Sequence, residues 1–320
     1  MSHTHRPSRP RTVRTVTSLR SALAPHRTAG SSIALVPTMG ALHEGHLSLI
    51  RHARRTCDVV VVSLFVNPSQ FNEAADLERY PRDEHGDLEL AGQAGADLLF
   101  APSASEVYPE GFVTCVEVHG LTDRLEGAIR GSEHFRGVAT VVTKLLCMTM
   151  PDVACFGQKD AQQVVVVRRL VADLNLPVRI EVRPTVRDAD GLALSSRNAL
   201  LSQVERAQAL ALPAALGAAR RHAAAGERDA RDLVQAAERE LSSRGVRPDY
   251  VELVDPDMFS PLDWLDGAGL LVLAARVGRV RLIDNTTLAP ARAAPEPGVA
   301  SIGLQPTLDG GLALPGKAIA

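Results

Sequence analysis

The sequence predicts an α/β protein in which a Rossmann-like parallel-sheet domain is followed by a smaller α+β domain. From residue 33 onward, short β-branched runs alternate with amphipathic stretches, a pattern typical of a parallel sheet covered by helices. After residue 198 the pattern changes to alanine-rich helices followed by three strand-like runs. With 320 residues, 45% of them hydrophobic, the chain is long enough to bury a core in each part.

The strands expected in the parallel sheet are almost wholly apolar, which suits a sheet buried on both faces. They are Ile33–Val36, Val59–Val66, Asp97–Phe100, Val113–Val118, Val153–Phe156 and Val178–Val182. The helices expected between them repeat apolar residues with helical spacing. They are His46–Arg55, Arg82–Ala94, Val138–Met148 and Ala161–Asp173.

The second half of the chain predicts two helices and three strands. The helices are Leu201–Ala225 and Asp229–Ser243, and the strands are Tyr250–Val254, Leu270–Ala275 and Arg279–Ile283. We therefore expect an N-terminal extension with a first helix at 1–30, the Rossmann-like domain at 31–187 and the smaller domain at 188–288. Residues 289–320 are rich in Pro, Gly and Ala and contain no aromatic residue, so a disordered tail is expected there.

Charge and composition favour a small-molecule substrate. The formal net charge is −2 and the pI is about 6.6, so neither nucleic acid nor an anionic membrane is attracted by the chain as a whole. No apolar run approaches a membrane span and no secretion signal is present, which predicts a cytoplasmic protein. Met1–Arg27 carries six arginines and no acid. A transit peptide or a nucleic-acid-binding arm fits this segment, but a loose extension is the simpler interpretation.

The four cysteines predict reduced thiols rather than a disulfide framework or a metal site. Cys57, Cys115, Cys147 and Cys155 show no C-x-x-C spacing and no accompanying histidine pattern. Three of them, Cys57, Cys115 and Cys155, lie in or beside apolar runs. We expect all four cysteines to be reduced thiols in the core.

The segment Pro37–His46, PTMGALHEGH, is the strongest functional signal because it follows an apolar strand and opens a helix. Backbone N–H groups at such a helix start favour an anion. His43 and His46 are three residues apart, so their imidazoles are expected on one face, flanking one phosphate. A capped helix with two surface histidines and a metal pair are the alternatives, but metal-binding histidines on a helix are usually four residues apart.

Three further segments place polar residues where an apolar strand ends. Leu64–Phe71 offers Asn67 and Gln70, whose amides suit the hydroxyls and carboxylate of a small hydroxy acid. Phe156–Gln163 offers Lys159 for phosphates, and Val186–Asn198 ends in a Ser-Ser-Arg-Asn run that can grip phosphate. Each segment also has a purely structural interpretation: the first as a turn, the second as a solvated helix start and the third as a helix cap.

A strand followed by H-x-G-H resembles the HxGH nucleotidyltransferases, and the string PTMGALHEGH is similar to that of the pantothenate synthetases. The resemblance covers about Ile33 to Asn285, because the other three segments follow in the family's order. Two departures are Gln158 and Ala161, where the family has Glu and an aromatic residue. The stretch Leu125–Val138 resembles the family's flap without its usual proline.

This resemblance implies an enzyme that condenses pantoate with β-alanine through a pantoyl-adenylate, releasing pyrophosphate and AMP. It implies catalytic roles for His43, His46 and Lys159, and contacts of Gln70 and Gln163 with pantoate or β-alanine. The implied ATP contacts are Met39, Gly40, Ala41, Leu42, His43, Glu44, Gly45, His46, Gly157, Gln158, Lys159, Asp160, Val186, Leu194, Ser195, Ser196 and Arg197.

The resemblance also implies Mg²⁺ held mainly by the triphosphate, for which Asp83–Asp87 could supply one ligand, and a homodimer with Val113–Val118 as a possible edge. No nucleic-acid partner is expected. Two alternatives stay open: an adenylyltransferase that leaves the nucleotide on its product, and a non-catalytic nucleotide- or RNA-binding protein with the arginine-rich N-terminus as its arm.

Overall fold

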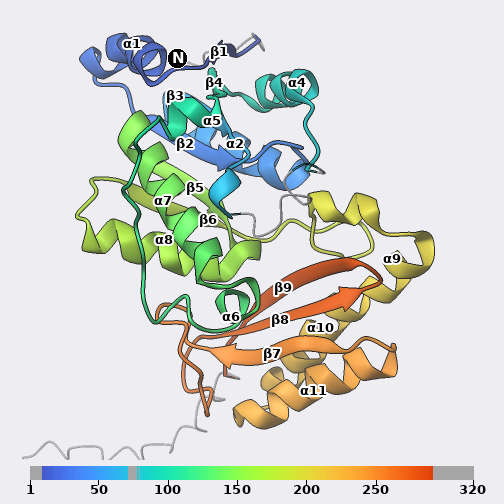
Figure 1. Cartoon of the computed structure of the whole chain (residues 1–320). Coiled ribbons are helices and arrows are strands. Elements are labelled where there is room, and N and C mark those ends of the chain that lie inside the picture. Colours follow the sequence, from blue (N-terminus) through green and yellow to red (C-terminus); the bar gives the residue numbers. More distant parts are fainter. Residues whose placement is uncertain (1–8, 71–77, 79, 291–320) are drawn as a thin grey trace, which may run out of the picture. The chain divides into compact units, whose positions relative to one another are not determined.

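A parallel sheet forms the first part of the fold, as expected. The computed structural model describes residues 9–70, 78 and 80–290. Six strands pair in the order β1-β4-β3-β2-β5-β6, and all of these pairs are parallel (Figure 1). They are β1 (Arg11–Val13), β2 (Ile33–Thr38), β3 (Val59–Leu64), β4 (Leu98–Phe100), β5 (Val153–Gly157) and β6 (Arg179–Arg183). The strand order reverses between β2 and β5, which is the point where open α/β sheets bind ligands.

Helices cover both faces of this sheet because successive side chains of each strand point to opposite sides. Leu35 and Val61 pack with α1 (Val16–Thr28), α7 (Ser132–Thr149) and α8 (Ala161–Asp173). Val36 and Val62 pack on the other side with α2 (Glu44–Thr56) and α4 (Glu84–Ala94). The near-continuous apolar strands are therefore explained by burial on two faces.

The second sheet is antiparallel and has the order β7-β8-β9. Its strands are β7 (Pro248–Val254), β8 (Gly269–Val277) and β9 (Val280–Leu288). Leu271 and Leu273 face the alanine-rich helices α10 (Ala211–Ala224) and α11 (Ala230–Ser243). Leu270 and Val272 face the other way and form a core with Val165 of α8. The small sheet is thus buried on both faces, and one of them packs on the domain that carries the parallel sheet.

The strand expected at Val113–Val118 is wrong. Residues 113–118 have no strand pairing, and the side chain of Val113 is 92% exposed. The alternation of β-branched and polar residues is real, but the segment runs beside α7, where the backbone N–H of Val116 donates to Thr140 Oγ1 at 2.9 Å. Val116 and Val118 pack against the core without a neighbouring strand. The alternation of β-branched and polar residues therefore reflects an extended segment with one buried side, and not membership of a sheet.

Two other differences have local causes. β1 is three residues long and pairs with β4 through Arg11 and Leu98, which is too short to produce a pattern. The helix expected over Leu201–Ala225 divides into α9 (Gln203–Ala209) and α10, and the first turn of α10 contains Pro213, which has no N–H to continue the α9 hydrogen bonds. Ser202 caps α9 by accepting from the N–H of Glu205.

The cysteine prediction holds in part. All four cysteines are free thiols, and Cys57 and Cys155 are buried. Cys115 and Cys147 are exposed, so the expectation of core thiols is wrong for these two. Cys115 lies in the segment that does not form a strand, and Cys147 lies on an open position of α7. Burial raises the pKa of the Cys155 thiol to about 12, which makes it unreactive.

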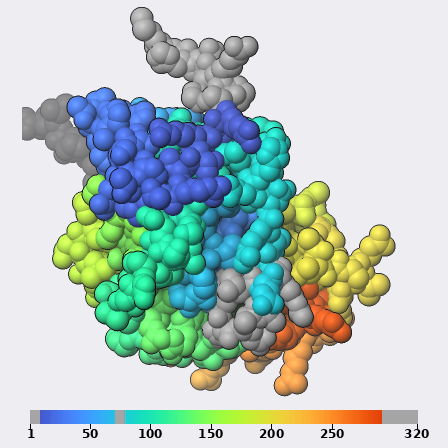
Figure 2. Space-filling model, turned by 45° about the horizontal axis from the view of Figure 1, so that its top comes forward, coloured from blue at the N-terminus to red at the C-terminus, as the bar shows by residue number. Residues whose placement is uncertain are grey.

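Shorter helices complete the fold: α5 (Ala104–Val107), α6 (Glu126–Arg130) and the 3₁₀ turns η1 (Pro68–Gln70), η2 (Gln158–Asp160) and η3 (Ser196–Leu200). Figure 2 shows the N-terminal segment in dark blue beside the blue-green segment that carries α5. The backbone N–H of Val16 donates to Glu106 Oε1 at 2.8 Å across this contact. Among the described helices, none is long and apolar enough to cross a membrane.

Candidate active site

A cavity of about 230 Å³ opens where the carboxyl ends of β2, β3 and β5 meet. It is lined by most of the residues that the sequence predicted for the site. These are Met39, His43, Gly45, His46, Gln70, Gly157, Lys159, Asp160, Gln163, Val186, Leu194, Ser195, Ser196 and Arg197. Five predicted residues are not on its wall: Gly40, Ala41, Leu42, Glu44 and Gln158. The four polar segments are therefore brought together from distant parts of the chain.

The two histidines at the start of α2 cap the helix, and these caps fix which ring nitrogen of each imidazole carries the proton. His43 Nδ1 accepts from the N–H of Gly45 at 3.2 Å, and His46 Nδ1 accepts from the N–H of His43 at 3.4 Å. A neutral imidazole that accepts at Nδ1 carries its proton on Nε2. Both rings, whose centroids are 4.2 Å apart, can then donate from Nε2 to a ligand in the cavity.

Both histidines are held neutral. Burial, and next the neighbouring His43 imidazole, which opposes a second protonation beside it, lowers the pKa of His46 to about 3. Burial, and next the charge of Lys159, also lowers the pKa of His43. Desolvation penalises the charged imidazole, so near neutral pH these side chains act as hydrogen-bond donors without positive charge. The positive charge of the site comes from other residues.

The turn before α2 is held by a carboxylate rather than left open. Asp87 of α4 accepts from the N–H of Ala41 at 3.0 Å and from the N–H of Leu42 at 2.7 Å, and it is only 3% exposed. Gly40 and Ala41 both have positive φ, at 92° and 51°. A Cβ on Gly40 would lie 2.9 Å from Leu64 Cδ1, so only glycine fits. The backbone N–H groups of Ala41 and Leu42 therefore hold this turn through Asp87 and are not directed at a phosphate.

The other acids of the segment considered for magnesium are also engaged: Asp83 caps α4 by accepting from the N–H of Gly86 at 3.0 Å, and Glu84 pairs with Arg14. Asp87 is committed to the turn described above. The described residues contain no group of three or more His, Cys, Asp or Glu side chains placed to hold a metal ion. Asp160, whose carboxylate is 3.7 Å from Lys159 Nζ, is an acid on the cavity wall.

Two cations line the same cavity as the histidines. Lys159 lies in η2 at the end of β5, and Arg197 lies in η3 after the loop that follows Val186. Burial, and next the charge of Arg130, lowers the pKa of Arg197, as expected where cations gather. Tyr80, which the sequence did not suggest, also lines the cavity and hydrogen-bonds Ser196. Two neutral donors and two cations thus surround one space.

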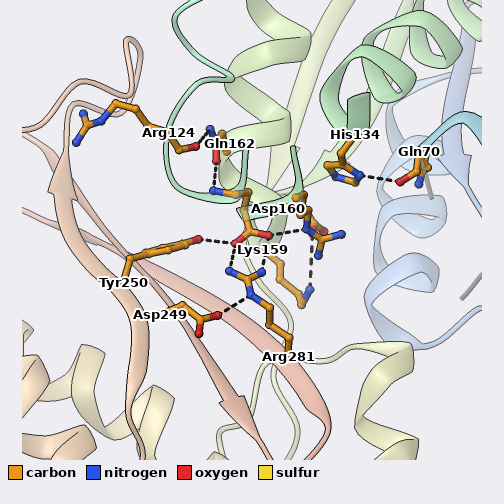
Figure 3. Close-up of polar contacts among 11 residues, drawn as sticks. Gln70, Arg124, His134, Lys159, Asp160, Gln162, Asp249, Tyr250 and Arg281 are labelled. Carbon is orange, nitrogen blue, oxygen red and sulfur yellow. Dashed lines mark hydrogen bonds and ion pairs between the residues drawn. The ribbon is translucent and has the colours of Figure 1, made fainter. Parts of the chain in front are cut away.

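The amide of Gln70 is oriented by its neighbours. Asn67 Nδ2 donates to Gln70 Oε1 at 3.2 Å, while Asn67 Oδ1 accepts from the hydroxyl of Tyr108 at 2.8 Å. Gln70 Nε2 in turn donates to the sulfur of Met39 at 2.8 Å, which leaves the second N–H of this amide for a ligand. The backbone oxygen of Gln70 contacts His134 Nδ1 at 2.9 Å, as Figure 3 shows.

The α7 helix forms an apolar wall beside Gln70. Val138, Val141, Val142 and Leu145, spaced at i, i+3, i+4 and i+7, line the cavity from one face of the helix. The helix approaches η1 so closely that a Cβ on Gly137 would lie 2.3 Å from the backbone oxygen of Ser69. The cavity therefore has an apolar side and a polar side, and could hold an acid with an aliphatic body next to a nucleotide.

A family profile for pantoate–β-alanine ligase matches residues 11–287. The chain belongs to the pantoate–β-alanine ligase family. It is 52% identical over 276 residues to a pantothenate synthetase of Cereibacter sphaeroides, a match that covers 86% of this chain and 99% of the relative. A pantothenate synthetase of Moorella thermoacetica is 51% identical over 277 residues, covering 86% of this chain and 98% of that relative.

Solved structures agree with this family and with its α/β fold. The crystal structure of pantothenate synthetase from Thermus thermophilus superposes with a TM-score of 0.83 at 47% identity, covering 88% of this chain and all of the other. The pantoate–β-alanine ligase of Francisella tularensis, described as complexed with β-γ ATP and β-alanine, superposes with a TM-score of 0.71 at 34% identity, covering 87% of this chain and 97% of the other.

In this pantoate–β-alanine ligase family member, a buried ionic cluster joins α6 to strands β7 and β9 of the small sheet. Glu126, 7% exposed, accepts from Tyr250 and Arg281, each at 2.8 Å, and from Arg130 Nε at 2.8 Å. Arg281 Nε donates to Asp249 Oδ2 at 2.6 Å (Figure 3). Burial opposes ionisation of Glu126, but the arginines lower its pKa to about 2. Tyr250 and Arg281 are more than 100 residues away from Glu126 in sequence, so no local pattern could reveal the cluster.

Proposed function

We propose that the protein condenses pantoate with β-alanine at the cavity described above, using ATP. The observation that carries the proposal is the arrangement of four phosphate-directed groups around one space. The Nε2–H donors of His43 and His46 face the cations Lys159 and Arg197, and the Gln70 and Gln163 amides lie beside them. The apolar wall of α7 matches the two methyl groups of pantoate.

In the first step a carboxylate oxygen of pantoate attacks the α-phosphorus of ATP. The bond from this phosphorus to the bridging oxygen of the β-phosphate breaks, pyrophosphate leaves, and pantoyl-adenylate remains. Negative charge grows on the bridging oxygen and is spread over the phosphoryl oxygens. The cations Lys159 and Arg197 and the neutral donors His43 and His46 stabilise this charge from fixed positions, so no protein nucleophile is needed.

In the second step the free amine of β-alanine attacks the acyl carbon of pantoyl-adenylate. The bond from that carbon to the phosphate oxygen breaks, AMP leaves, and the amine loses a proton as the amide forms. Gln70 offers Nε2–H to a substrate oxygen because Asn67 engages its carbonyl. Gln163, in the first turn of α8, is proposed as a second contact with pantoate.

Mg²⁺ is proposed to enter with ATP and to be held mainly by phosphate oxygens, since it dehydrates reluctantly and binds few protein carboxylates. Its chemistry would be to neutralise charge on the triphosphate. Asp160 is the acid on the cavity wall that would face it. A cytoplasmic location, expected from the sequence, and a homodimer, implied by the family, are further proposals; sedimentation of the purified chain would test the dimer.

The decisive assay supplies ATP, pantoate and β-alanine, omits each in turn, and follows pyrophosphate and AMP. We expect pyrophosphate release to require pantoate and AMP release to require the amine as well. An adenylyltransferase would retain the nucleotide on its product, and a binding protein would release no pyrophosphate. Lys159→Met should abolish the pantoate-dependent release, whereas Lys144→Met, a matched loss of a lysine outside the cavity, should not. Pyrophosphate release independent of pantoate would refute the proposal.

A further inference from the structure

Two consecutive buried polar residues lie on β9, beside the turn that carries Lys159. Asp284 is 2% exposed and Asn285 is 5% exposed, in a strand otherwise buried through apolar side chains. Asn285 pairs with Val272 of β8, and Asp284 pairs with Leu273. Val272 belongs to the core shared with α8, so Asn285 shares the face of the small sheet that packs on the parallel-sheet domain. A buried amide there requires partners.

Those partners are the backbone of the turn that carries Lys159. Asn285 Nδ2 donates to the carbonyl oxygen of Gln158 at 2.9 Å and to that of Lys159 at 3.0 Å. Both hydrogens of the amide are thus used on one short turn, η2, which joins β5 to α8. The side chain of Lys159 leaves this turn toward the cavity, where Figure 3 shows it beside Asp160.

Asp284 holds the other phosphate-directed loop. Its Oδ2 and Oδ1 accept from Arg187 Nη1 and Nη2 at 2.7 and 2.9 Å, a two-bond contact that fixes direction as well as distance. Arg187 Nη1 also donates to the carbonyl oxygen of Gly191, inside the loop that leads to Arg197. The N–H of Asn285 donates to Asp284 Oδ1 at 2.8 Å, which ties the two side chains together.

We propose that Asn285 is a positioning residue for Lys159, and that with Asp284 it sets the distance between the Lys159 turn and the Arg197 loop. Both cations must reach the same triphosphate, and each is carried on a short irregular segment. Two adjacent residues of a regular strand hold both segments, so β9 fixes the distance between them. For its catalytic consequence this inference rests on the proposed function; the position of Lys159 is a separate, measurable property.

The kinetic test uses Asn285→Ala, which removes both donors without adding bulk. Displacement of a reacting group by about 1 Å can cost about a hundredfold in rate. We expect kcat/KM for ATP in pantoate-dependent pyrophosphate release to fall about tenfold to a hundredfold, with KM for β-alanine unchanged. Thr287→Ala, at an exposed position of the same strand, is the matched control and should behave as wild type.

A general loss of stability is separated by Leu288→Ala, which removes a buried side chain of β9 that is 2% exposed and has no role at the Lys159 turn. Rates are expressed per folded protein, from circular dichroism at the assay temperature. We expect Leu288→Ala to lower the melting temperature while keeping wild-type kcat/KM. If Leu288→Ala matches the kinetic loss of Asn285→Ala, or if Asn285→Ala stays within twofold of wild type, the proposal is overturned.

A second arm observes Lys159 without any turnover. The sequence contains three lysines, Lys144, Lys159 and Lys317, so acetylation by acetic anhydride can be read for each by peptide mass spectrometry. ATP should protect Lys159, and Asn285→Ala should raise the ATP concentration for half-protection about tenfold, with Lys144 as internal reference. An unchanged half-protection concentration would overturn the inference. If wild-type protein binds ATP but forms no pantothenate, the proposed function fails while this arm still decides on Asn285.

Discussion

The two ends of the cavity are built from contacts of very different range. At the histidine end, the backbone N–H groups of His43 and Gly45 orient the imidazoles of His46 and His43 within three residues. Asp87 holds the preceding turn from the next helix on the same side of the sheet. At the cation end, Lys159 depends on Asn285, 126 residues away in sequence. The first end is complete within the parallel-sheet domain, whereas the second requires the small sheet to be docked. Substitutions should therefore separate effects on catalysis from effects on the docking of the small sheet.

The largest effect is expected from His46→Ala at the histidine end. It removes the Nε2–H donor, and loss of one preorganised donor costs about 100-fold to 1000-fold in kcat. It also removes half of the helix cap, worth about 1 kcal/mol of stability. Pantoate-dependent pyrophosphate release in a single turnover measures the first effect, and thermal unfolding the second. His26→Ala, at an exposed position of α1, is the matched control. A wild-type rate for His46→Ala would remove His46 from the mechanism.

The difference in range also explains what the sequence could reveal. His43 and His46 could be singled out as a pair because both lie in one motif at a strand end, and both line the cavity together with Lys159 and Arg197. Most of the parallel sheet followed from continuous apolar strands. The pairing that brings β9 to the Lys159 turn has no periodic signal, since one Asp-Asn pair in a strand resembles any other.

The failures have equally specific causes. The amides of Ala41 and Leu42 looked free for an anion, but a carboxylate 45 residues away from Leu42 uses both. Val113–Val118 has the alternation of a strand, yet it lies along a helix that offers no backbone partners. In both cases the local pattern was read correctly, and a tertiary neighbour decided its use. Which of several compatible neighbours packs against a segment is decided by the tertiary structure as a whole.

Glu126→Gln should have the next largest effect, and at the docking interface rather than on chemistry. The glutamine keeps an acceptor for Tyr250 but removes the buried charge that Arg130 and Arg281 share, while Arg281 keeps its contact with Asp249. Breaking one partner of a buried ion pair costs about 3 kcal/mol or more. Denaturant unfolding should show this loss. His46→Gln should be far less destabilised and far less active. Equal stability of the two variants would erase the contrast between the two ends.

The effect that is smallest per pH unit is the pH dependence of stability, which assigns one window to each end. The pKa of His46 is lowered to about 3 in the folded state, so its contribution is present above 6.5, the unfolded value, and is lost as the pH falls below it. The pKa of Glu126 is lowered to about 2, so its contribution is lost only as the pH falls below 4.5. Each proton changes the free energy of unfolding by at most about 1.4 kcal/mol per pH unit.

Urea unfolding between pH 7 and 3 can separate these windows. His46→Gln should flatten the decline between pH 6.5 and 4.5, although His43 and His134, whose pKa values are also lowered, keep part of it. Glu126→Gln should leave that range unchanged and flatten the decline below pH 4.5. If both variants flattened the same range, the histidine end and the docking interface would titrate as one unit. The distinction between a locally built end and a remotely held end would then be wrong.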